Sequence, residues 1–172
     1  MKNIFDFNTA VSDKILDKIT NTYNDIYFNK RLPEEIKRAK RYKFSIALLV
    51  IDIDNFSAFN EEYGISTGNS ALGEIADIIK GQIRETDILG RTGDDEFGII
   101  LLHTDKNTAE IMSEKIKMTI GLRSFPGSKD KKINLSVTVG ISIFPDESEN
   151  AQQLIEKANE NLIKNKFKPD QS

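Results

Sequence analysis

Runs of apolar residues alternate along the chain with polar, turn-forming segments, and their periods predict both strands and helices. The longest run, Phe44–Ile53, has almost no polar interruption before its acidic end, which predicts a strand buried on both faces. Two further apolar runs, 88–89 and 98–102, flank a short polar segment with Gly-Asp at its tip, which predicts a β-hairpin. Alternation of apolar and polar residues over Ile133–Ile143 predicts another strand.

Apolar residues at helical spacing predict helices on either side of these strands. In chain order they are an amphipathic lead-in helix over Phe5–Ile19, a helix opened by Pro33 that ends in the basic run 37–43, and helices over 56–63, 67–83, 108–120 and 151–167. This order predicts an α/β domain with a central mixed β-sheet surrounded by helices, in two or three layers. Residues 1–20 are expected to form the N-terminal lead-in and residues 21–172 the domain.

The composition fits one globular domain and narrows the range of functions. The 172 residues carry a formal net charge of −3, so no global field draws the chain to nucleic acid. The absence of cysteine excludes disulfides and thiolate metal sites. Because no apolar stretch reaches membrane-spanning length and the N-terminus lacks the features of a signal peptide, we expect a cytoplasmic protein without a membrane segment.

Acidic residues gather where two predicted strands end. Asp94, Asp95 and Glu96 follow one another at the hairpin turn, and Asp52 and Asp54 close the buried strand. Adjacent carboxylates repel one another unless a cation or a function holds them, although an acidic turn exposed to solvent is the simpler interpretation of the hairpin alone. If the buried strand lies beside the hairpin, Asp52 and Asp95 face one another. Two carboxylates with a backbone carbonyl between them then make an oxygen-ligand site suited to Mg²⁺, which predicts a metal–nucleotide site.

Four motifs follow one another along the chain: Asp17–Asn24, Asp52–Phe56 with Asn60, Tyr63-Gly64 with Gly68, and the hairpin Gly93–Phe97. In this order and at this spacing they resemble the GGDEF family, the diguanylate cyclase domain, and the resemblance extends from Asp17 to about Lys166. It implies a GGDEF fold, similar to a nucleotidyl cyclase palm, for residues 21–172. It also implies bacterial cyclic di-GMP signalling, in which two domains meet face to face, each carrying one GTP, and join the two GTP molecules into cyclic di-GMP.

The resemblance assigns a role to each matching residue. The metal, Mg²⁺ or Mn²⁺, would bind Asp52, the carbonyl of Ile53 and Asp95, while Glu96 and Asp95 would serve catalysis. The expected GTP contacts are the backbone around Asp54, Asn55 and Phe56 and the side chain of Lys166 at the phosphates, Asn60 and Asn69 at guanine, and Gly93 in the hairpin.

Arg84 and Asp87 form an Arg-x-x-Asp at the offset of the family's inhibitory site for cyclic di-GMP. Arg84 would fork to a phosphate or a guanine face, and Asp87 would accept guanine N–H bonds. The alternative interpretation of the pair is a local ion pair at a helix end.

Several residues depart from the family pattern, and they affect the substrate cradle more than the metal pair. The departures are Asp94 for the second signature glycine, Ser57 for lysine, Ile65 for histidine, Asn69 for aspartate, Asp25-Ile26 for two arginines, and Pro169-Asp170-Gln171 for Gly-Arg-Asn. A carboxylate at position 94 adds bulk and negative charge near the phosphates. An amide at position 69 cannot accept two N–H bonds as a carboxylate can.

We therefore expect a degenerate domain that binds cyclic di-GMP at Arg84 and Asp87, and secondarily GTP with Mg²⁺, with weak or no cyclase activity. One alternative is an active diguanylate cyclase with feedback inhibition. The other is a dimerisation or regulatory module without a nucleotide, which the retained Asp52 and Asp95 disfavour. A homodimer is expected in the active or product-bound state, and the sequence does not identify the upstream sensor or partner.

Overall fold

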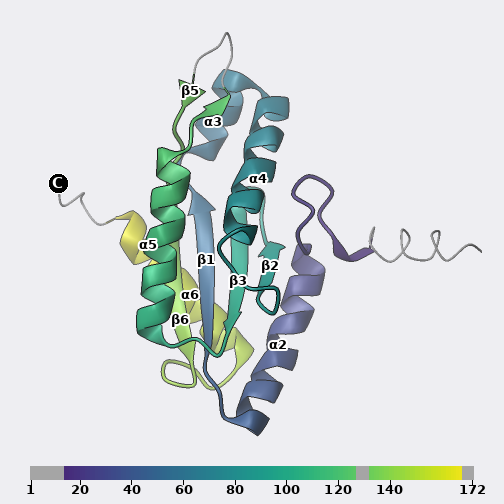
Figure 1. The fold of residues 1–172 in the computed structure, drawn as a ribbon, viewed down its shortest axis with the longest axis vertical. Coiled ribbons are helices and arrows are strands. Elements are labelled where there is room, and N and C mark those ends of the chain that lie inside the picture. The colour runs from purple at the N-terminus through teal and green to yellow at the C-terminus, as the bar shows by residue number, and fades with distance from the viewer. Residues whose placement is uncertain (1–13, 127–131, 168–172) are drawn as a thin grey trace, which may run out of the picture.

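The computed structural model describes residues 14–126 and 132–167, which form three layers with a four-stranded sheet in the middle (Figure 1). The elements in chain order are α2 (Asp25–Tyr42), β1 (Ile46–Ile53), α3 (Phe56–Tyr63), α4 (Ile65–Lys80), β2 (Ile88–Arg91), β3 (Glu96–Leu102), α5 (Lys106–Leu122), β4 (Phe125–Pro126), β5 (Lys132–Ile133), β6 (Val137–Phe144) and α6 (Ala151–Lys166). The expected central sheet with helices around it is confirmed, and β4 and β5 form a separate small ribbon.

The strands of the main sheet lie in the order β2-β3-β1-β6, and each neighbouring pair is antiparallel. The sheet was expected to be mixed, but among residues 14–126 and 132–167 the one parallel contact is an isolated bridge between Tyr23 and Gly90. The reason is that each helical crossover, from β1 to β2 and from β3 to β6, joins two strands of the same direction and skips one strand between them. Helical crossovers, which usually indicate parallel neighbours, therefore coexist here with antiparallel ladders.

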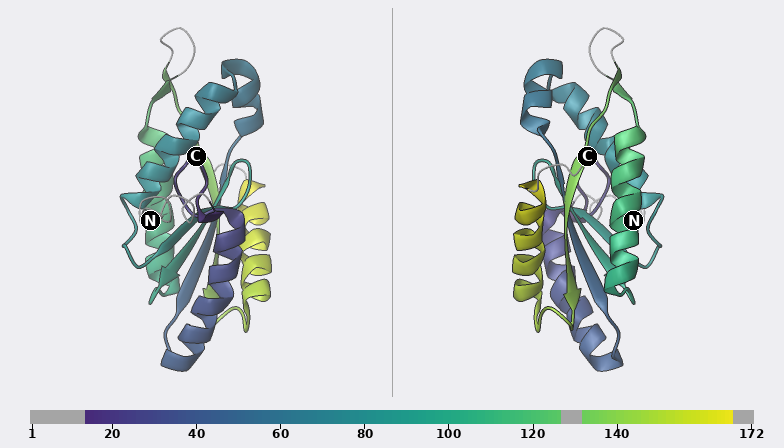
Figure 2. Two further views of the ribbon diagram at one scale, coloured as in Figure 1. Left: turned by 90° about the vertical axis from the view of Figure 1, so that its right-hand side faces the viewer. Right: turned by 90° about the vertical axis from the view of Figure 1, so that its left-hand side faces the viewer.

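Both faces of the sheet are covered, which explains why β1 is apolar almost throughout. On one face Ala47, Leu49 and Ile51 pack against α3, α4 and α5. On the other face Leu48 and Val50 pack against α2 and α6. Figure 2 shows the sheet nearly edge-on, with α2 and α6 on one side and α4 and α5 on the other. The apolar run of β1 therefore follows from burial on two faces, as predicted.

The bounds of three predicted elements need correction. Helix α2 begins at Asp25 rather than near Pro33, because the Asn24 side chain caps it by accepting a hydrogen bond from Tyr27 N, and Pro33 lies inside the helix. Helix α4 ends at Lys80 and not at residue 83. The strand expected over 133–143 is divided into β5 and β6, since residues 134–136 leave the strand between them.

The predicted lead-in helix falls largely outside the described residues, which begin at Lys14. Its predicted end at Ile19 is wrong, because Leu16 already forms a bridge with Tyr23. Asp17 then closes a turn by accepting hydrogen bonds from the backbone N–H groups of Ile19 and Thr20. The division of the chain at residue 20 stays a prediction.

Candidate functional site

The centre of the candidate site is formed where β1 meets the β2–β3 hairpin. Asp52 pairs with Glu96 in the β1–β3 ladder, and one residue further Ile53 N donates a hydrogen bond to Asp95 O over 3.0 Å. Burial, and then the negative charge of Asp52, raise the pKa of the Asp95 carboxyl above its ordinary value. The structure thus brings together the Asp52 and Asp95 carboxylates, which the sequence placed on different elements.

Lys166, the last residue of α6, completes this charged group. Its Nζ lies 2.7 Å from Asp52 Oδ1 in a partly exposed ion pair. The ammonium lowers the pKa of Asp95, but burial and the neighbouring carboxylates outweigh it. Negative charge therefore remains in excess at this end of the sheet, although a lysine is already present.

The oxygen atoms gathered at this point are of the type that binds a divalent cation such as Mg²⁺. Asp52 offers carboxylate oxygens from β1, and Asp95 offers them from the turn just before β3. The carbonyl of Ile53, whose N–H donates to Asp95 O, is the third predicted ligand. Burial, and then the charge of Asp52, raise the pKa of Asp95, and a divalent cation at this point would favour the charged form of both carboxylates. Over residues 14–126 and 132–167, no three or more His, Asp or Glu side chains gather with metal-binding geometry, so backbone, water and phosphate oxygens would supply the remaining ligands.

The turn after β1 was expected to cradle phosphates. Asn55 has a left-handed backbone conformation with φ 54°, and α3 starts immediately after it without a side-chain cap. The first N–H groups of a helix lack intrahelical partners and favour anions. Phe56 is buried and stacks on Phe59, so at position 56 the backbone is the part suited to contact a ligand. This turn is consistent with the predicted phosphate contacts.

Asp54 has a structural partner that the sequence did not reveal. Its carboxylate accepts hydrogen bonds from Ser136 Oγ over 2.6 Å and from Thr138 Oγ1 over 2.7 Å, and its N–H donates to Ser136 O. These bonds tie the end of β1 to the start of β6. Ser136 and Thr138 also line a hollow of about 730 Å³, together with Asn55, Lys117, Asn165 and Lys166. Neither Lys117 nor Asn165 was predicted, because single polar residues on helices give no distinctive pattern.

The residues expected at guanine lie where α3 and α4 meet. The Asn60 side-chain oxygen is buried and has no hydrogen-bond partner among the residues that the structure describes. A Cβ on Gly68 would lie 1.8 Å from this oxygen, so the glycine provides the space that the amide occupies. Asn69 follows directly on α4 and is partly buried. An unpaired buried acceptor costs about 1–3 kcal/mol, which favours a ligand N–H at this position.

The signature hairpin is held by its own side chains. Glu96 Oε1 accepts a hydrogen bond from Thr92 Oγ1 over 2.6 Å. Arg91 donates to the carbonyls of Gly93 and Asp94, and its third nitrogen lies 3.2 Å from Asp17 Oδ2. Asp94 is exposed, and Arg91 contacts its backbone carbonyl and not its carboxylate. Arg91 thus connects the N-terminal motif to the hairpin tip.

Arg84 and Asp87 lie in the loop between α4 and β2, beside a separate hollow of about 380 Å³ that Tyr23 and Lys80 also line. Asp87 Oδ2 accepts a hydrogen bond from Arg84 N over 2.9 Å, and Oδ1 accepts one from Leu102 N over 3.1 Å. Within the described part of the chain the Arg84 guanidinium makes no ion pair, so the simple ion pair considered as an alternative is not formed. Asp87 thus holds the loop, and the Arg84 side chain is exposed, while the role of the pair in binding cyclic di-GMP stays a prediction.

These observations define an α/β domain with a two-carboxylate site suited to a metal and phosphates at one end of an antiparallel sheet. The profile of the family "Diguanylate cyclase, GGDEF domain" matches residues 14–171. The chain therefore belongs to the GGDEF family, as the motifs indicated.

Curated relatives and solved structures agree with this assignment. Diguanylate cyclase A of Treponema denticola is 33% identical over 124 residues, which are 72% of this chain and 33% of that protein. Diguanylate cyclase TpbB of Pseudomonas aeruginosa is 31% identical over 145 residues, 83% of this chain and 33% of that protein. The chain thus spans about a third of the length of these relatives.

The GGDEF domain of DgcB from Caulobacter crescentus, solved in complex with cyclic di-GMP, has the same fold. Its TM-score is 0.85 at 24% identity, over 90% of this chain and 88% of that one.

Among the helices of the described residues, none combines the length and apolar character needed to cross a bilayer.

Proposed function

We propose that this domain acts in cyclic di-GMP signalling as a degenerate GGDEF receptor. It binds cyclic di-GMP through Arg84 and Asp87, and it binds GTP with Mg²⁺ or Mn²⁺ at Asp52 and Asp95, with weak or no cyclase activity. Its place is the cytoplasm, where GTP is available. The observation that carries the receptor role is the exposed Arg84 guanidinium beside a loop that Asp87 holds with both carboxylate oxygens.

The chemistry of this loop suits a guanine dinucleotide. An exposed guanidinium can fork to a phosphate or stack on a guanine face. Asp87 Oδ1 and Oδ2 each accept one backbone N–H, and a carboxylate oxygen has a second lone pair for a ligand donor. The DgcB domain, which shares this fold, was solved with cyclic di-GMP.

We expect weak cyclase turnover because of the charges near the proposed phosphate position. Asp94 adds a carboxylate at the exposed hairpin tip, and Lys166 already pairs with Asp52. Phosphoryl transfer depends on positioning and on electrostatic stabilisation, so missing cations and added anions reduce the rate more than they reduce metal binding. When bound, the metal would supply charge neutralisation at the phosphates, and Asp52, Asp95 and the Ile53 carbonyl would hold it.

An active cyclase is the second candidate function, and the convergence of Asp52, Asp95 and Lys166 favours it. In that case two domains would meet as a homodimer, with Glu96 at the reacting groups. A module without any nucleotide is disfavoured, because two close carboxylates and the unpaired oxygen of Asn60 then have no function.

The deciding experiment is a calorimetric titration of the purified protein with cyclic di-GMP and, separately, with GTP plus Mg²⁺, while the GTP sample is followed for product. We expect cyclic di-GMP binding with little or no turnover. Efficient turnover would instead establish a cyclase with Arg84 and Asp87 as its feedback site. Binding of neither ligand would reject both candidates.

A further inference from the structure

Helix α6 covers the outer edge of β6. Asp54 N donates to Ser136 O across the β1–β6 pairing, so the carbonyl of residue 136 faces β1. Carbonyls alternate in direction along a strand, and those of Val139 and Ile141 therefore point away from β1. No further strand pairs with this edge in the described residues, whereas α6 lies along it (Figure 2).

Two asparagines of α6 bind this free edge. Asn165 Nδ2 donates to Val139 O over 2.8 Å, and Asn161 Nδ2 donates to Ile141 O over 2.8 Å. Four residues of a helix advance about 6 Å and two residues of a strand about 6.6 Å, so an i, i+4 pair of amides matches two successive outward carbonyls. The side chains of α6 thus take the place that N–H groups of another strand would have.

Gly140 makes this contact possible. A Cβ at position 140 would lie 2.1 Å from Ala158 O and 2.5 Å from Leu162 N, both of them backbone atoms of α6. Because glycine has no Cβ, the helix backbone can approach the strand closely. Asparagine is a short side chain, and at a greater distance its amide would not reach the strand edge.

The second amide adjoins the candidate site. Asn165 directly precedes Lys166, whose ammonium lies 2.7 Å from Asp52 Oδ1. Lys166 is the last residue of α6, and a terminal helical turn lacks part of its hydrogen bonding and frays easily. Val139, which Asn165 holds, is the neighbour of Thr138, the partner of Asp52 in the β1–β6 ladder. The Asn165 bond and the Lys166 ion pair therefore fix the same turn to adjacent points of the sheet.

We propose that Asn165 is a positioning residue for Lys166. By holding the Val139 carbonyl, Asn165 keeps the last turn of α6 in the place from which Lys166 reaches Asp52 and lines the hollow of about 730 Å³ beside it. Asn161 makes the same bond one turn earlier without adjoining a site residue, and so has a structural role alone. The inference rests on the proposed function in one respect, namely that Lys166 contacts the phosphates of GTP.

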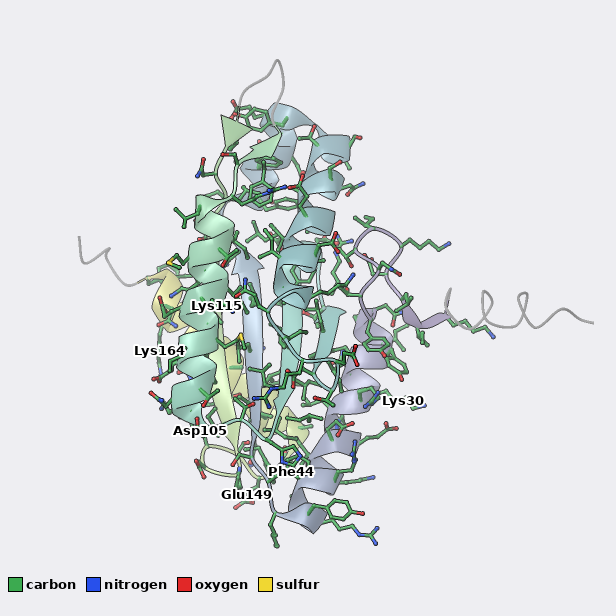
Figure 3. All side chains as sticks on the ribbon, in the orientation of Figure 1. Lys30, Phe44, Asp105, Lys115, Glu149 and Lys164 are labelled. Carbon is green, nitrogen blue, oxygen red and sulfur yellow. The ribbon has the colours of Figure 1, made fainter. Side chains whose placement is uncertain are left out.

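The experiment compares Asn165→Ala with the matched control Asn161→Ala, which loses an equivalent bond. Calorimetry with GTP and Mg²⁺ should show about tenfold weaker binding for Lys166→Met, a loss in the range expected for a charged contact. We expect roughly three- to fivefold weaker binding for Asn165→Ala, and a change below about twofold for Asn161→Ala. Lys164→Met, which removes an exposed charge of the same helix (labelled in Figure 3), controls for net charge and should bind as the parent protein does.

The double variant Asn165→Ala/Lys166→Met separates positioning from general stability. If Asn165 acts through Lys166, this variant binds GTP no more weakly than Lys166→Met alone. Equal losses for the two asparagine variants, or additive losses in the double variant, would overturn the inference.

A nucleotide-free measurement keeps this test separate from the proposed function. In urea unfolding, Lys166→Met should lower the midpoint in the parent protein and in Asn161→Ala, but much less in Asn165→Ala, where the ion pair is already loosened. If the parent protein binds no GTP, the GTP-binding part of the proposed function fails while the unfolding cycle still decides the role of Asn165. A cycle without coupling rejects the positioning role on its own.

Discussion

Substitution of Asp17 by asparagine tests the connection between the N-terminal motif and the signature hairpin. Asp17 Oδ1 accepts hydrogen bonds from Thr20 N and Thr20 Oγ1, both over 2.8 Å, and Oδ2 lies 3.2 Å from the Arg91 guanidinium. Asparagine keeps one acceptor oxygen but loses the charge. The two side chains are 21% and 13% exposed, which places the pair between a surface ion pair and a buried one. We therefore expect a loss of about 1–2 kcal/mol in the free energy of unfolding at pH 7.

The loss in stability caused by Asp17→Asn should also depend on pH, in a direction that the pKa of Asp17 determines. Burial raises the pKa of Asp17, but the Thr20 hydrogen bonds and the Arg91 charge outweigh it, and the folded-state pKa lies below the ordinary value of 3.8. A group whose pKa is depressed by folding stabilises the protein above its unfolded pKa, and this contribution is lost as the pH falls through the folded pKa. The difference between parent and Asp17→Asn should thus be constant above about pH 5 and shrink below about pH 4.

Urea unfolding between pH 3 and pH 7 measures this difference. Asp77→Asn is the control, since Asp77 is 78% exposed and its Lys80 partner lies at 3.6 Å, so its removal should change little. An undiminished difference at pH 3, or none at pH 7, would refute the stabilising role of the Asp17 charge.

Four further changes test the site. Arg84→Ala should abolish cyclic di-GMP binding in calorimetry and leave GTP binding unchanged; retained cyclic di-GMP binding would reject the receptor site. Asp94→Gly should raise any cyclase activity in a product assay, and no gain would mean that other departures dominate. Gly68→Ala should displace the Asn60 amide, lower the free energy of unfolding by about 1–3 kcal/mol in urea and weaken GTP binding, whereas parent-like affinity would exclude Asn60 from the guanine contacts. Asp52→Asn should abolish Mn²⁺ binding measured by electron paramagnetic resonance, and retained binding would show that Asp52 is not a metal ligand.

The elements that could be predicted are those encoded by local pattern. Strand β1 is recognisable because burial on two faces requires an apolar run, and the hairpin because its turn chemistry lies within a few residues. The start of α2 was missed because Pro33 resembled a first-turn proline, whereas the Asn24 cap and the packing of Phe28 extend the helix eight residues earlier. Strand directions were missed because each crossover skips a strand, and the sequence does not record which strands become neighbours.

Some residues of the candidate site could likewise be predicted from local sequence pattern, and others could not. Asp52 and Asp95 could be paired from the sequence because carboxylates at the ends of two apolar strands have few structural explanations. Ser136 and Thr138 could not, because their partner Asp54 lies 82 and 84 residues away and the contact depends on the register of β6. Asn161 and Asn165 resemble ordinary polar positions of a helix until the close approach at Gly140 is known.

Asp54 shows how the structure changes the meaning of a predicted residue. Asp54 is a third carboxylate at this end of the sheet. Its two oxygens accept hydrogen bonds from two hydroxyl groups, which stabilise the charged form and hold the side chain against β6. The backbone at Asn55 and Phe56 is thereby fixed at the start of α3, where free N–H groups favour an anion. Asp94 at the exposed hairpin tip is the acidic residue that departs from the family pattern. Under the proposed function we therefore expect Asp94→Gly to change turnover more than metal binding.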